Sequence, residues 1–499
     1  MTPTLVVADH ILTGFTTDGT PQIYADAAML IEDGVVAAIG PTDHLRRAHP
    51  AASEFGGRGR VVIPGLINAH HHVGLTPFQL GARDQPLELW FPERLTMRDV
   101  DPHLDTLYSA FEMVASGVTC VQHLHSRAPG DIEAVLRTSE AIIGAYTELG
   151  MRASYSFAMR DQNRMIYAAD EEFVASLPAD LRAPVLDYLK SFVIPLAEQI
   201  EIFRILRDRW QAHPLIAIQI APSNLHWLSD TALESAARLA EETGAPMHMH
   251  LLETPYQKEY ARRRTGGSAL AFIDKFGLIG PNLTIGHGVW MEPDELTLLA
   301  DRGACICHNC SSNLRLKSGT ADLNAFIASG ARVALGIDEA GINDDRDMLQ
   351  EMRLALTLHR PAGHEKISPT APQILRMVTE HGAATTPFGA QIGRLTIGSN
   401  ADLAILDWGK VTWPWQDPEI PLVDTLVRRA KAGSVESVMV SGNVIFHEGS
   451  FTSIDHESIR DRIASSFRAE LTETEVARRA LAQQLIEPVA SFYKTWSLK

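Results

Sequence analysis

Three consecutive histidines, His70, His71 and His72, end an apolar segment that reads VVIPGLINAHHHVGL over residues 61–75. In a β-strand, residues two apart point to the same side, so His70 and His72 point together and His71 points away. Imidazole pairs at this spacing suit a borderline metal such as zinc. A solvated turn explains the triplet alone equally well.

Three further strand ends carry a histidine or a carboxylate. The segment APMHMHLLET places His248 and His250 in alternation, with Glu253 three residues after His250. The segment LTIGHGVWM ends a strand at His287, and VALGIDEAG places Asp338 after an apolar strand. Buried histidines are common, so each segment alone indicates little. Four such strand ends in one chain favour a metal site.

Short apolar strands alternate with helical patterns through the middle of the chain. Helical patterns cover residues 132–149, 229–243, 292–302 and 347–359, and Ser229 and Asp322 are the expected N-caps of two helices. Eight β–α repeats favour a parallel (β/α)8 barrel over a doubly wound sheet, and such barrels carry their chemistry at the carboxyl ends of the strands. The strands are predicted to end near His72, His125, Phe157, Ser223, Glu253, Trp290, Asn309 and Asp338.

Both chain ends read as short strands with turns, and neither end buries itself convincingly alone. We therefore predict that residues 1–63 and 387–452 form one small β domain and that residues 64–386 form the catalytic, metal-binding barrel. Residues 453–499 are predicted to form a helical appendage. A long segment after the third strand, residues 160–209, reads as a helical insertion and a possible lid.

The composition of the 499-residue chain limits the kinds of partner and the cellular location that we expect. A net charge of −17, spread along the chain, disfavours nucleic acid and anionic membranes and leaves a small molecule as the expected partner. The sequence contains no stretch of 18 apolar residues and no secretory pattern over residues 1–27. Four cysteines do not make a disulfide framework, so a reducing cytoplasm fits best.

Three of the four cysteines, Cys305, Cys307 and Cys310, lie close together around His308 in the segment CICHNC. This is not a usual spacing for a structural zinc site, and no second pair lies nearby in the sequence. A buried strand with small apolar cysteines is the favoured interpretation.

The sequence resembles the amidohydrolase superfamily, in particular its branch of cytosine, guanine, S-adenosylhomocysteine and triazine aminohydrolases. The resemblance covers about residues 35–449 and is carried by PGLINAHHH, GVTCV, HLLET, GHGVW, SSNLRLKSG, GIDEAGINDDRDM and GRLTIGSNADLAILD. It implies a distorted (β/α)8 TIM barrel with a small β-sandwich domain built from both chain ends. It also implies a homo-oligomer, either a dimer or a tetramer.

The resemblance assigns roles at the strand ends. Glu253 is implied as the proton shuttle, His287 as the catalytic histidine and Asp338 as the acceptor of a proton from water. The fourth strand, LIAIQIAPSN, has neither the lysine nor the glutamate of two-metal members, which favours one divalent metal per chain. Zn²⁺ is expected, with Fe²⁺ or Mn²⁺ as alternatives. The implied metal ligands are His70, His72, His250 and Asp338, and the spacing to Glu253 favours His250 over its rival His248.

Contacts to the substrate are predicted less directly. Trp90 lies on the loop after the first strand, where it either stacks on a flat heterocycle or packs the loop. Ser223 stands where relatives of the S-adenosylhomocysteine type have a histidine in a GPH-like segment, and this departure weakens the transfer of their substrate. The candidate substrate contacts are Trp90, His123, Asn224, His226 and Trp227.

The first functional hypothesis is an aminohydrolase that releases ammonia or a small amine from an amino-substituted purine, pterin, pyrimidine or s-triazine. The second is hydrolysis of an acyclic amide, urea or carbamate on the same metal, which the unusual fourth strand and the insertion leave open. A catalytically silent scaffold would have lost ligands, and all four are present. A nucleic-acid deaminase of the zinc type is disfavoured because the sequence contains no P-C-x-x-C motif.

Overall fold

A parallel β-barrel takes up the middle of the chain in the computed structural model, which describes residues 3–126, 129–496 and 498. Two runs of paired strands, β5-β6-β7-β8 and β10-β11-β12-β13, are closed into a barrel by β9 and by isolated bridges between Ile220 and Met247 and between His71 and Asp338. The barrel strands are β5 (Leu66–His71), β6 (Val118–His125), β7 (Arg152–Met159), β8 (Ile216–Ile218), β9 (Ala221–Pro222), β10 (Met247–Leu251), β11 (Leu283–His287), β12 (Cys305–His308) and β13 (Arg332–Leu335).

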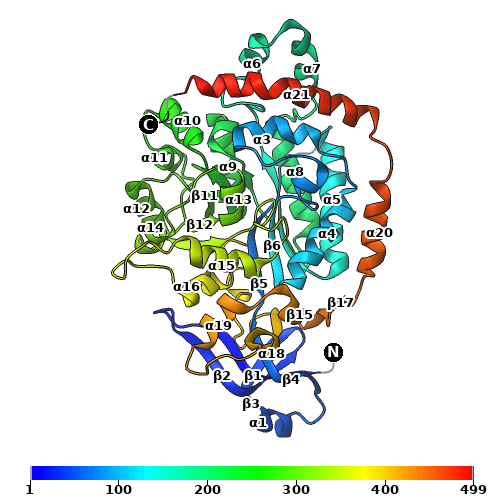
Figure 1. Cartoon of the computed structure of the whole chain (residues 1–499), viewed down its shortest axis with the longest axis vertical. Helices are drawn as coiled ribbons and strands as arrows, with labels where there is room; N and C mark the ends of the chain where they lie inside the picture. The colour runs from blue at the N-terminus through cyan, green and yellow to red at the C-terminus, as the bar shows by residue number, and fades with distance from the viewer. Residues whose placement is uncertain (1–2, 127–128, 497, 499) are drawn as a thin grey trace.

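Helices connect the barrel strands and surround them (Figure 1). The Asp131 side chain accepts a hydrogen bond from the backbone of Ala134 and begins α5, and Gly150 ends this helix at a φ of 79°. Ser229 and Asp322 cap their helices as predicted. These helices are α4 (Pro102–Ala115), α5 (Ile132–Leu149), α8 (Leu196–Trp210), α9 (Asp230–Thr243), α10 (Pro255–Thr265), α11 (Ala269–Asp274), α12 (Pro293–Arg302), α13 (Cys310–Arg315), α14 (Leu323–Ala328), α15 (Met348–Leu358), α16 (Ala371–Met377) and α17 (Glu380–Ala384).

The two chain ends share one mixed sheet, which confirms the predicted β domain. Strand β4 pairs with β14 through Ile63 and Ala404, and then runs through Gly65 into the first barrel strand, so this sheet is joined directly to the barrel. The sheet order is β17-β16-β15-β14-β4-β1-β2-β3. Its elements are β1 (Thr4–Phe15), β2 (Pro21–Glu32), β3 (Val35–Pro41), β4 (Ser53–Pro64), β14 (Leu403–Asp407), β15 (Val435–Val440), β16 (Asn443–His447) and β17 (Ser450–Phe451), with α1 (Thr42–Ala48), α18 (Trp408–Thr412) and α19 (Leu422–Arg429) beside it.

Segments from three parts of the chain gather over one end of the barrel (Figure 1). The last helix, α21 (Glu473–Lys494), contacts α3 (Leu87–Glu93) and the short helix η1 (Arg94–Thr96), and α6 (Asp170–Ser176) packs with α7 (Ala179–Lys190). We call α3, α6, α7 and α21 the cap. The remaining short elements are α2 (Pro77–Leu80), α20 (His456–Ser466), η2 (Leu225–Trp227), η3 (Gly389–Gln391) and η4 (Ala432–Ser434).

The insertion after β7 is shorter than the predicted residues 160–209. Helix α8 contacts β7, β8 and α5, so it belongs to the helical layer of the barrel, and the inserted part ends before Leu196. The sequence shows helical periodicity in both parts, and only the packing tells them apart.

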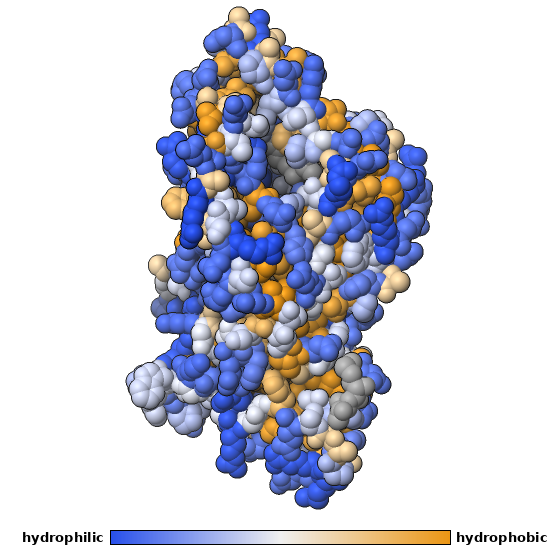
Figure 2. All heavy atoms as spheres, turned by 90° about the vertical axis from the view of Figure 1, so that its right-hand side faces the viewer, coloured by the Kyte–Doolittle hydropathy of each residue, from blue (hydrophilic) through white to orange (hydrophobic). Residues whose placement is uncertain are grey.

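Hydrophilic residues cover most of the face in Figure 2, with smaller hydrophobic areas between them. Among the described helices, none combines the length and the apolar character of a membrane span.

Candidate metal centre

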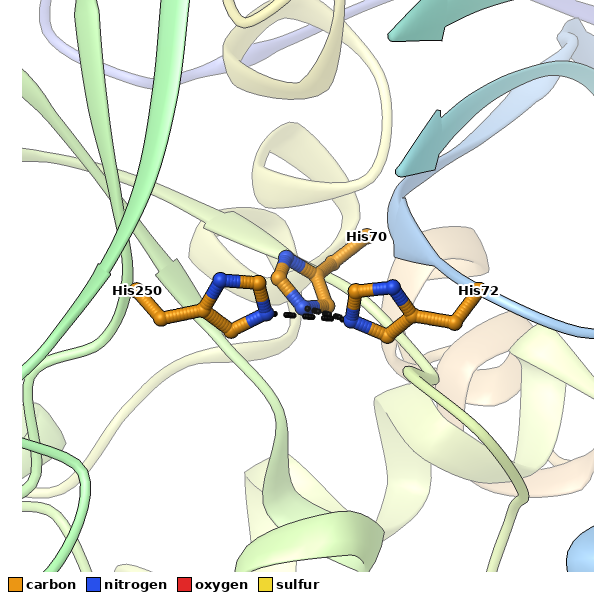
Figure 3. Close-up of side chains that lie close together, drawn as sticks. All are labelled: His70, His72 and His250. Carbon is orange, nitrogen blue, oxygen red and sulfur yellow. Dashed lines mark hydrogen bonds between the residues drawn. The ribbon is translucent and has the colours of Figure 1, made fainter. Parts of the chain in front are cut away.

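Three histidines from two strands point toward one another at the carboxyl end of the barrel (Figure 3). His70 and His72 lie at the end of β5 and His250 lies in β10. The Nε2 atom of His72 is 3.1 Å from Nε2 of His70 and 3.0 Å from Nε2 of His250. Three ring nitrogens at such short separations form a set of donors for one cation.

Asp338 adds a carboxylate to this group. Its Oδ1 atom lies 3.2 Å from Nε2 of His72 and 3.6 Å from Nε2 of His70. Its Oδ2 atom accepts a hydrogen bond of 2.5 Å from the Ser312 hydroxyl and lies 3.8 Å from Nε2 of His287. Asp338 and His287 have φ values of 65° and 71°, a left-handed conformation that non-glycine residues rarely adopt. The surrounding packing therefore holds both residues in a strained backbone.

Contacts on the far side of each ring set the direction of its other nitrogen. The Nδ1–H group of His72 donates to the Leu124 carbonyl at 2.5 Å, and that of His250 donates to the Ser223 carbonyl at 2.9 Å. Both Nε2 lone pairs then face the group, as in metal sites in general. Nδ1 of His70 lies 2.8 Å from Nε2 of His248, so His248 stands behind His70.

The ionisation of these rings also fits a metal. Burial, and then the neighbouring histidines, lower the pKa of His250 to about 3, and burial lowers the pKa of His72 to about 3. Both imidazoles are therefore neutral near pH 7 and keep the lone pair that a metal needs. With one carboxylate added, the donor set fits a divalent metal of the zinc type.

Glu253 and His287 lie beside the proposed ligands. Oε1 of Glu253 is 3.8 Å from Nδ1 of His287 and accepts a hydrogen bond from the Ser318 hydroxyl. Burial, together with the charge of Asp338, raises the pKa of the Glu253 carboxyl. The Nδ1–H group of His287 donates to Oδ1 of Asn313 at 2.9 Å, which leaves Nε2 as the acceptor that faces Asp338.

A glycine allows two strands to approach closely behind the histidines. A Cβ atom at Gly336 would lie 2.5 Å from Cβ of His70 and 2.6 Å from Oδ1 of Asn309, which no side chain can occupy. The segment Gly336-Ile337-Asp338, which directly follows β13, can therefore bring Asp338 next to β5 because residue 336 has no side chain.

A small cavity of about 50 Å³ opens onto this group. Among the predicted substrate contacts, Trp90, Asn224 and Trp227 line it. His123 and His226 are not among its lining residues. The full lining is His72, Leu87, Trp90, Phe91, Arg94, Ser126, Asn224, Trp227, His250, Glu253, His287, Leu316, Asp338 and Glu339.

The two histidines outside the cavity have other neighbours. Nδ1 of His123 bonds to the hydroxyl of Tyr146, which lies on α5, so His123 faces the helical layer. The His226 ring lies between the rings of Tyr167 and Trp227, at centroid distances of 4.0 Å and 4.4 Å.

Sequence reasoning missed one charged pair in the cavity lining. The guanidinium carbon of Arg94 lies 4.7 Å from the centroid of the Trp90 ring, and Arg94 is 3.5 Å from a carboxylate oxygen of Glu339. Two signals pointed to the pair: Arg94 follows Trp90 by four residues, and Glu339 directly follows Asp338.

Comparisons with known proteins agree with this geometry. The amidohydrolase family matches residues 61–445, so the chain belongs to the amidohydrolase family, as its sequence indicates. A bacterial imidazolonepropionase-like composite domain matches residues 27–52. The chain is a hydrolytic enzyme on a TIM barrel with an attached β domain, which confirms the predicted fold.

Several relatives are deaminases by name. A 5-methylthioadenosine/S-adenosylhomocysteine deaminase of Syntrophobacter fumaroxidans is 28% identical over 90% of this chain and 94% of its own length. A 5'-deoxyadenosine deaminase of Methanopyrus kandleri is 28% identical over 88% of this chain and 94% of its own length.

Two solved structures share the fold. An adenosine deaminase from Xanthomonas campestris with bound zinc has a TM-score of 0.76 at 24% identity and covers 93% of this chain and 98% of its own. An atrazine chlorohydrolase from Arthrobacter aurescens in complex with zinc has a TM-score of 0.79 at 22% identity and covers 93% of this chain and 99% of its own.

Proposed function

We propose that this chain is a single-metal aminohydrolase that releases ammonia, or a small amine, from an amino-substituted nitrogen heterocycle. The observation that carries the proposal is one buried group of side chains that offers metal donors, a carboxyl of raised pKa and an imidazole acceptor together. The deaminase names of the relatives support the reaction type. Candidate substrates are amino-substituted purines, pterins, pyrimidines and s-triazines.

His70, His72, His250 and Asp338 would hold one divalent metal per chain, with Zn²⁺ favoured over Fe²⁺ or Mn²⁺. When bound, such a metal supplies an activated water near neutral pH. Zinc in two structures of the same fold supports this choice of metal. His248 contacts the far nitrogen of His70 and so orients this ligand.

The proton transfers follow from the positions of three side chains. Asp338 lies beside the donors and accepts a proton from the attacking water through its carboxylate. Nε2 of His287 would accept a hydrogen bond from the same water and so orient it toward the attacked carbon. Glu253, with its raised pKa, would give its proton to a ring nitrogen, take up the second proton of the added water and pass it to the leaving amine. The proton taken up by Asp338 would then restore the Glu253 carboxyl.

The cavity lining supports a flat substrate. The Trp90 ring lies on one side of the cavity, and the Arg94 guanidinium packs on that ring, so an aromatic surface is fixed there. Asn224 has a side-chain amide that could form hydrogen bonds with a heterocycle. The Ser223 hydroxyl donates to the Met159 carbonyl and its own carbonyl accepts from His250, so Ser223 does not take over the substrate contact expected of the histidine in S-adenosylhomocysteine-type relatives.

The same side chains would also hydrolyse an acyclic amide, urea or carbamate, and this is the second candidate because the fourth strand departs from the pattern of the relatives at Ser223. We further propose a reducing location, the cytoplasm, because all four cysteines are free thiols. A homo-oligomer, dimer or tetramer, stays a prediction.

The deciding experiment measures ammonia release by zinc-loaded enzyme across aminopurines, aminopterins, aminopyrimidines and aminotriazines, with His70→Ala as the control. Turnover of one compound that the control loses supports the proposal and names the substrate class. No ammonia from any compound, together with carboxylate or carbamate products from amides or ureas, contradicts it in favour of the second candidate.

A further inference from the structure

A second group of donor side chains lies between the barrel and its helices. His308 ends β12, Cys310 begins α13, and His359 directly follows α15. Cys307 packs with Ala69 of β5 and Ala334 of β13. Adjacent strand residues face opposite sides, so His308 faces outward, where its ring meets Phe326 of α14 at a centroid distance of 6.3 Å.

The three side chains converge on one point and are all buried. Nε2 of His308 is 2.9 Å from Nε2 of His359 and 2.9 Å from Sγ of Cys310. Sγ of Cys310 is 4.0 Å from Nε2 of His359. The ring nitrogens of His70, His72 and His250 are separated by similar distances, 3.0–3.1 Å for the two shortest pairs. The second group is thus as compact as the proposed catalytic one.

Hydrogen bonds alone do not satisfy these contacts. A ring nitrogen has either one lone pair or one N–H in the plane, and Nε2 of His308 makes two close contacts, one to an imidazole nitrogen and one to a thiol sulfur. The other nitrogen of the same ring, Nδ1, has no hydrogen-bond partner in the described part of the chain. The ring is therefore held at Nε2, and a cation there would accept a lone pair from each of the three side chains.

We propose that His308, Cys310 and His359 form a second metal site, distinct from the proposed catalytic centre, that binds Zn²⁺. One thiolate and two imidazoles are donors that zinc prefers. Around tetrahedral zinc, such donor atoms lie about 3.3–3.6 Å apart, so each needs to move by only a few tenths of an ångström. Binding exchanges the Cys310 thiol proton for a sulfur–zinc bond, and the proton leaves to solvent without any redox change.

This site would position residues of the catalytic centre. Cys310 begins α13, and the same first turn of this helix carries Ser312, which bonds to Asp338, and Asn313, which bonds to His287. A metal at Cys310 ties the start of α13 to β12 and to the end of α15. We assign the site a structural role because its donors lie among packed elements rather than at the cavity.

Cobalt substitution tests the site directly, because the proposed catalytic donors include no sulfur. Enzyme loaded with Co²⁺ should show an intense near-ultraviolet band from thiolate-to-cobalt charge transfer, and metal analysis should give two metals per chain. The band should disappear in Cys310→Ser and remain in Cys305→Ser, a matched change of another buried cysteine of the same segment. A wild-type protein without the band, or a band that persists in Cys310→Ser, would overturn the proposal.

If Cys310→Ser does not fold, a second measurement tests whether the second metal site exists. In the double variant His70→Ala and His72→Ala the catalytic group has lost two donors, so one metal per chain should remain. X-ray absorption of that zinc should then show a sulfur neighbour at about 2.3 Å. A spectrum with nitrogen and oxygen neighbours alone, or a variant that retains no metal, would overturn the second site and leave the aminohydrolase proposal untouched.

Discussion

Glu253 is the residue whose replacement most directly tests the proposed chemistry. In Glu253→Gln the side chain keeps its size, so the metal donors are undisturbed, but no carboxyl remains to transfer a proton. We expect kcat to fall by about 10²–10⁴-fold with unchanged metal content. Steady-state kinetics and metal analysis check this, with Glu241→Gln on the exposed face of α9 as the control. Full activity of Glu253→Gln would remove the proton-shuttle role.

Asn313 acts through the ring of His287. Its Oδ1 atom accepts the Nδ1–H of His287, which keeps the Nε2 lone pair directed toward Asp338. Asn313→Ala frees the ring to turn and to change tautomer, so we expect kcat to fall by about 10–100-fold while KM stays nearly constant. Kinetics across a pH range measure this. An equal fall in kcat for Asn443→Ala, which lies in β16 of the β domain and bonds to the Ser441 carbonyl, would indicate a general loss of stability.

Glu88 gives a pH-dependent contribution to stability. Burial raises the pKa of its carboxyl to about 7, although Thr254 and Tyr167 donate hydrogen bonds to it. Between pH about 4.5 and 7 the folded state then binds more protons than the unfolded state, so this group's contribution falls as pH rises, by about 3 kcal/mol in total. Glu88→Gln keeps both acceptor contacts and does not ionise. The melting temperature of Glu88→Gln should rise relative to that of the wild type as pH increases from 5 to about 8. A difference in melting temperature that stays constant over this range would contradict the raised pKa of Glu88.

At the scale of the element, local periodicity was enough to find most of the barrel. The helix predicted over 132–149 has the same bounds in the structure, and the strand ends at His287 and Asp338 lie within three residues of the observed ones. Apolar alternation and capping residues are local properties, so they can be recognised from residues that are neighbours in the sequence. The two parts of the predicted insertion differ only in what they pack against, which local patterns do not contain.

The features that the sequence did not predict are contacts between residues far apart in the chain. His359 meets His308 across 51 positions, and the Ser223 carbonyl orients His250 across 27. Every residue has a backbone carbonyl, so the sequence does not mark the one that orients His250. Two residues that are separated by a helix and a strand, such as His308 and His359, have no fixed spacing in the sequence. The ligands at strand ends were predictable because the barrel brings all carboxyl ends of its strands together.

The approach of β13 to β5 depends on one glycine. In Gly336→Ala the new Cβ would meet Cβ of His70 at 2.5 Å, so the two strands must separate and Asp338 moves from His70. We expect a loss of about 1–3 kcal/mol in stability and weaker metal binding. Thermal unfolding and metal titration measure both effects. Gly280→Ala, where nothing lies within 4 Å of the added Cβ, should change neither, and metal affinity equal to wild type in Gly336→Ala would contradict the argument.

At the scale of the molecule, the cavity is closed by parts that do not belong to the barrel core. Binding pockets for drug-sized ligands have about 300–1,000 Å³, far more than the 50 Å³ at the metal donors. Trp90 and Leu87 of α3, Phe173 of α6 and Tyr493 of α21 share an apolar cluster of their own, separate from the core of the barrel. We therefore predict that the cap moves as a unit and that a heterocycle enters when it opens.

Loosening the cap should change substrate binding without changing the metal. Tyr493 accepts a hydrogen bond from the backbone of Tyr167 and packs on its ring at 5.4 Å, so Tyr493→Ala removes a polar and an aromatic contact between α21 and the insertion. We expect faster amide hydrogen exchange in α3 and α21, unchanged exchange in the barrel strands and a KM raised several-fold. Ile459→Ala in α20, which packs on α4, is the matched control in the same tail. Equal acceleration in the barrel strands of Tyr493→Ala would mean that cap and barrel unfold together, and the cap would then be a fixed roof over a preformed site.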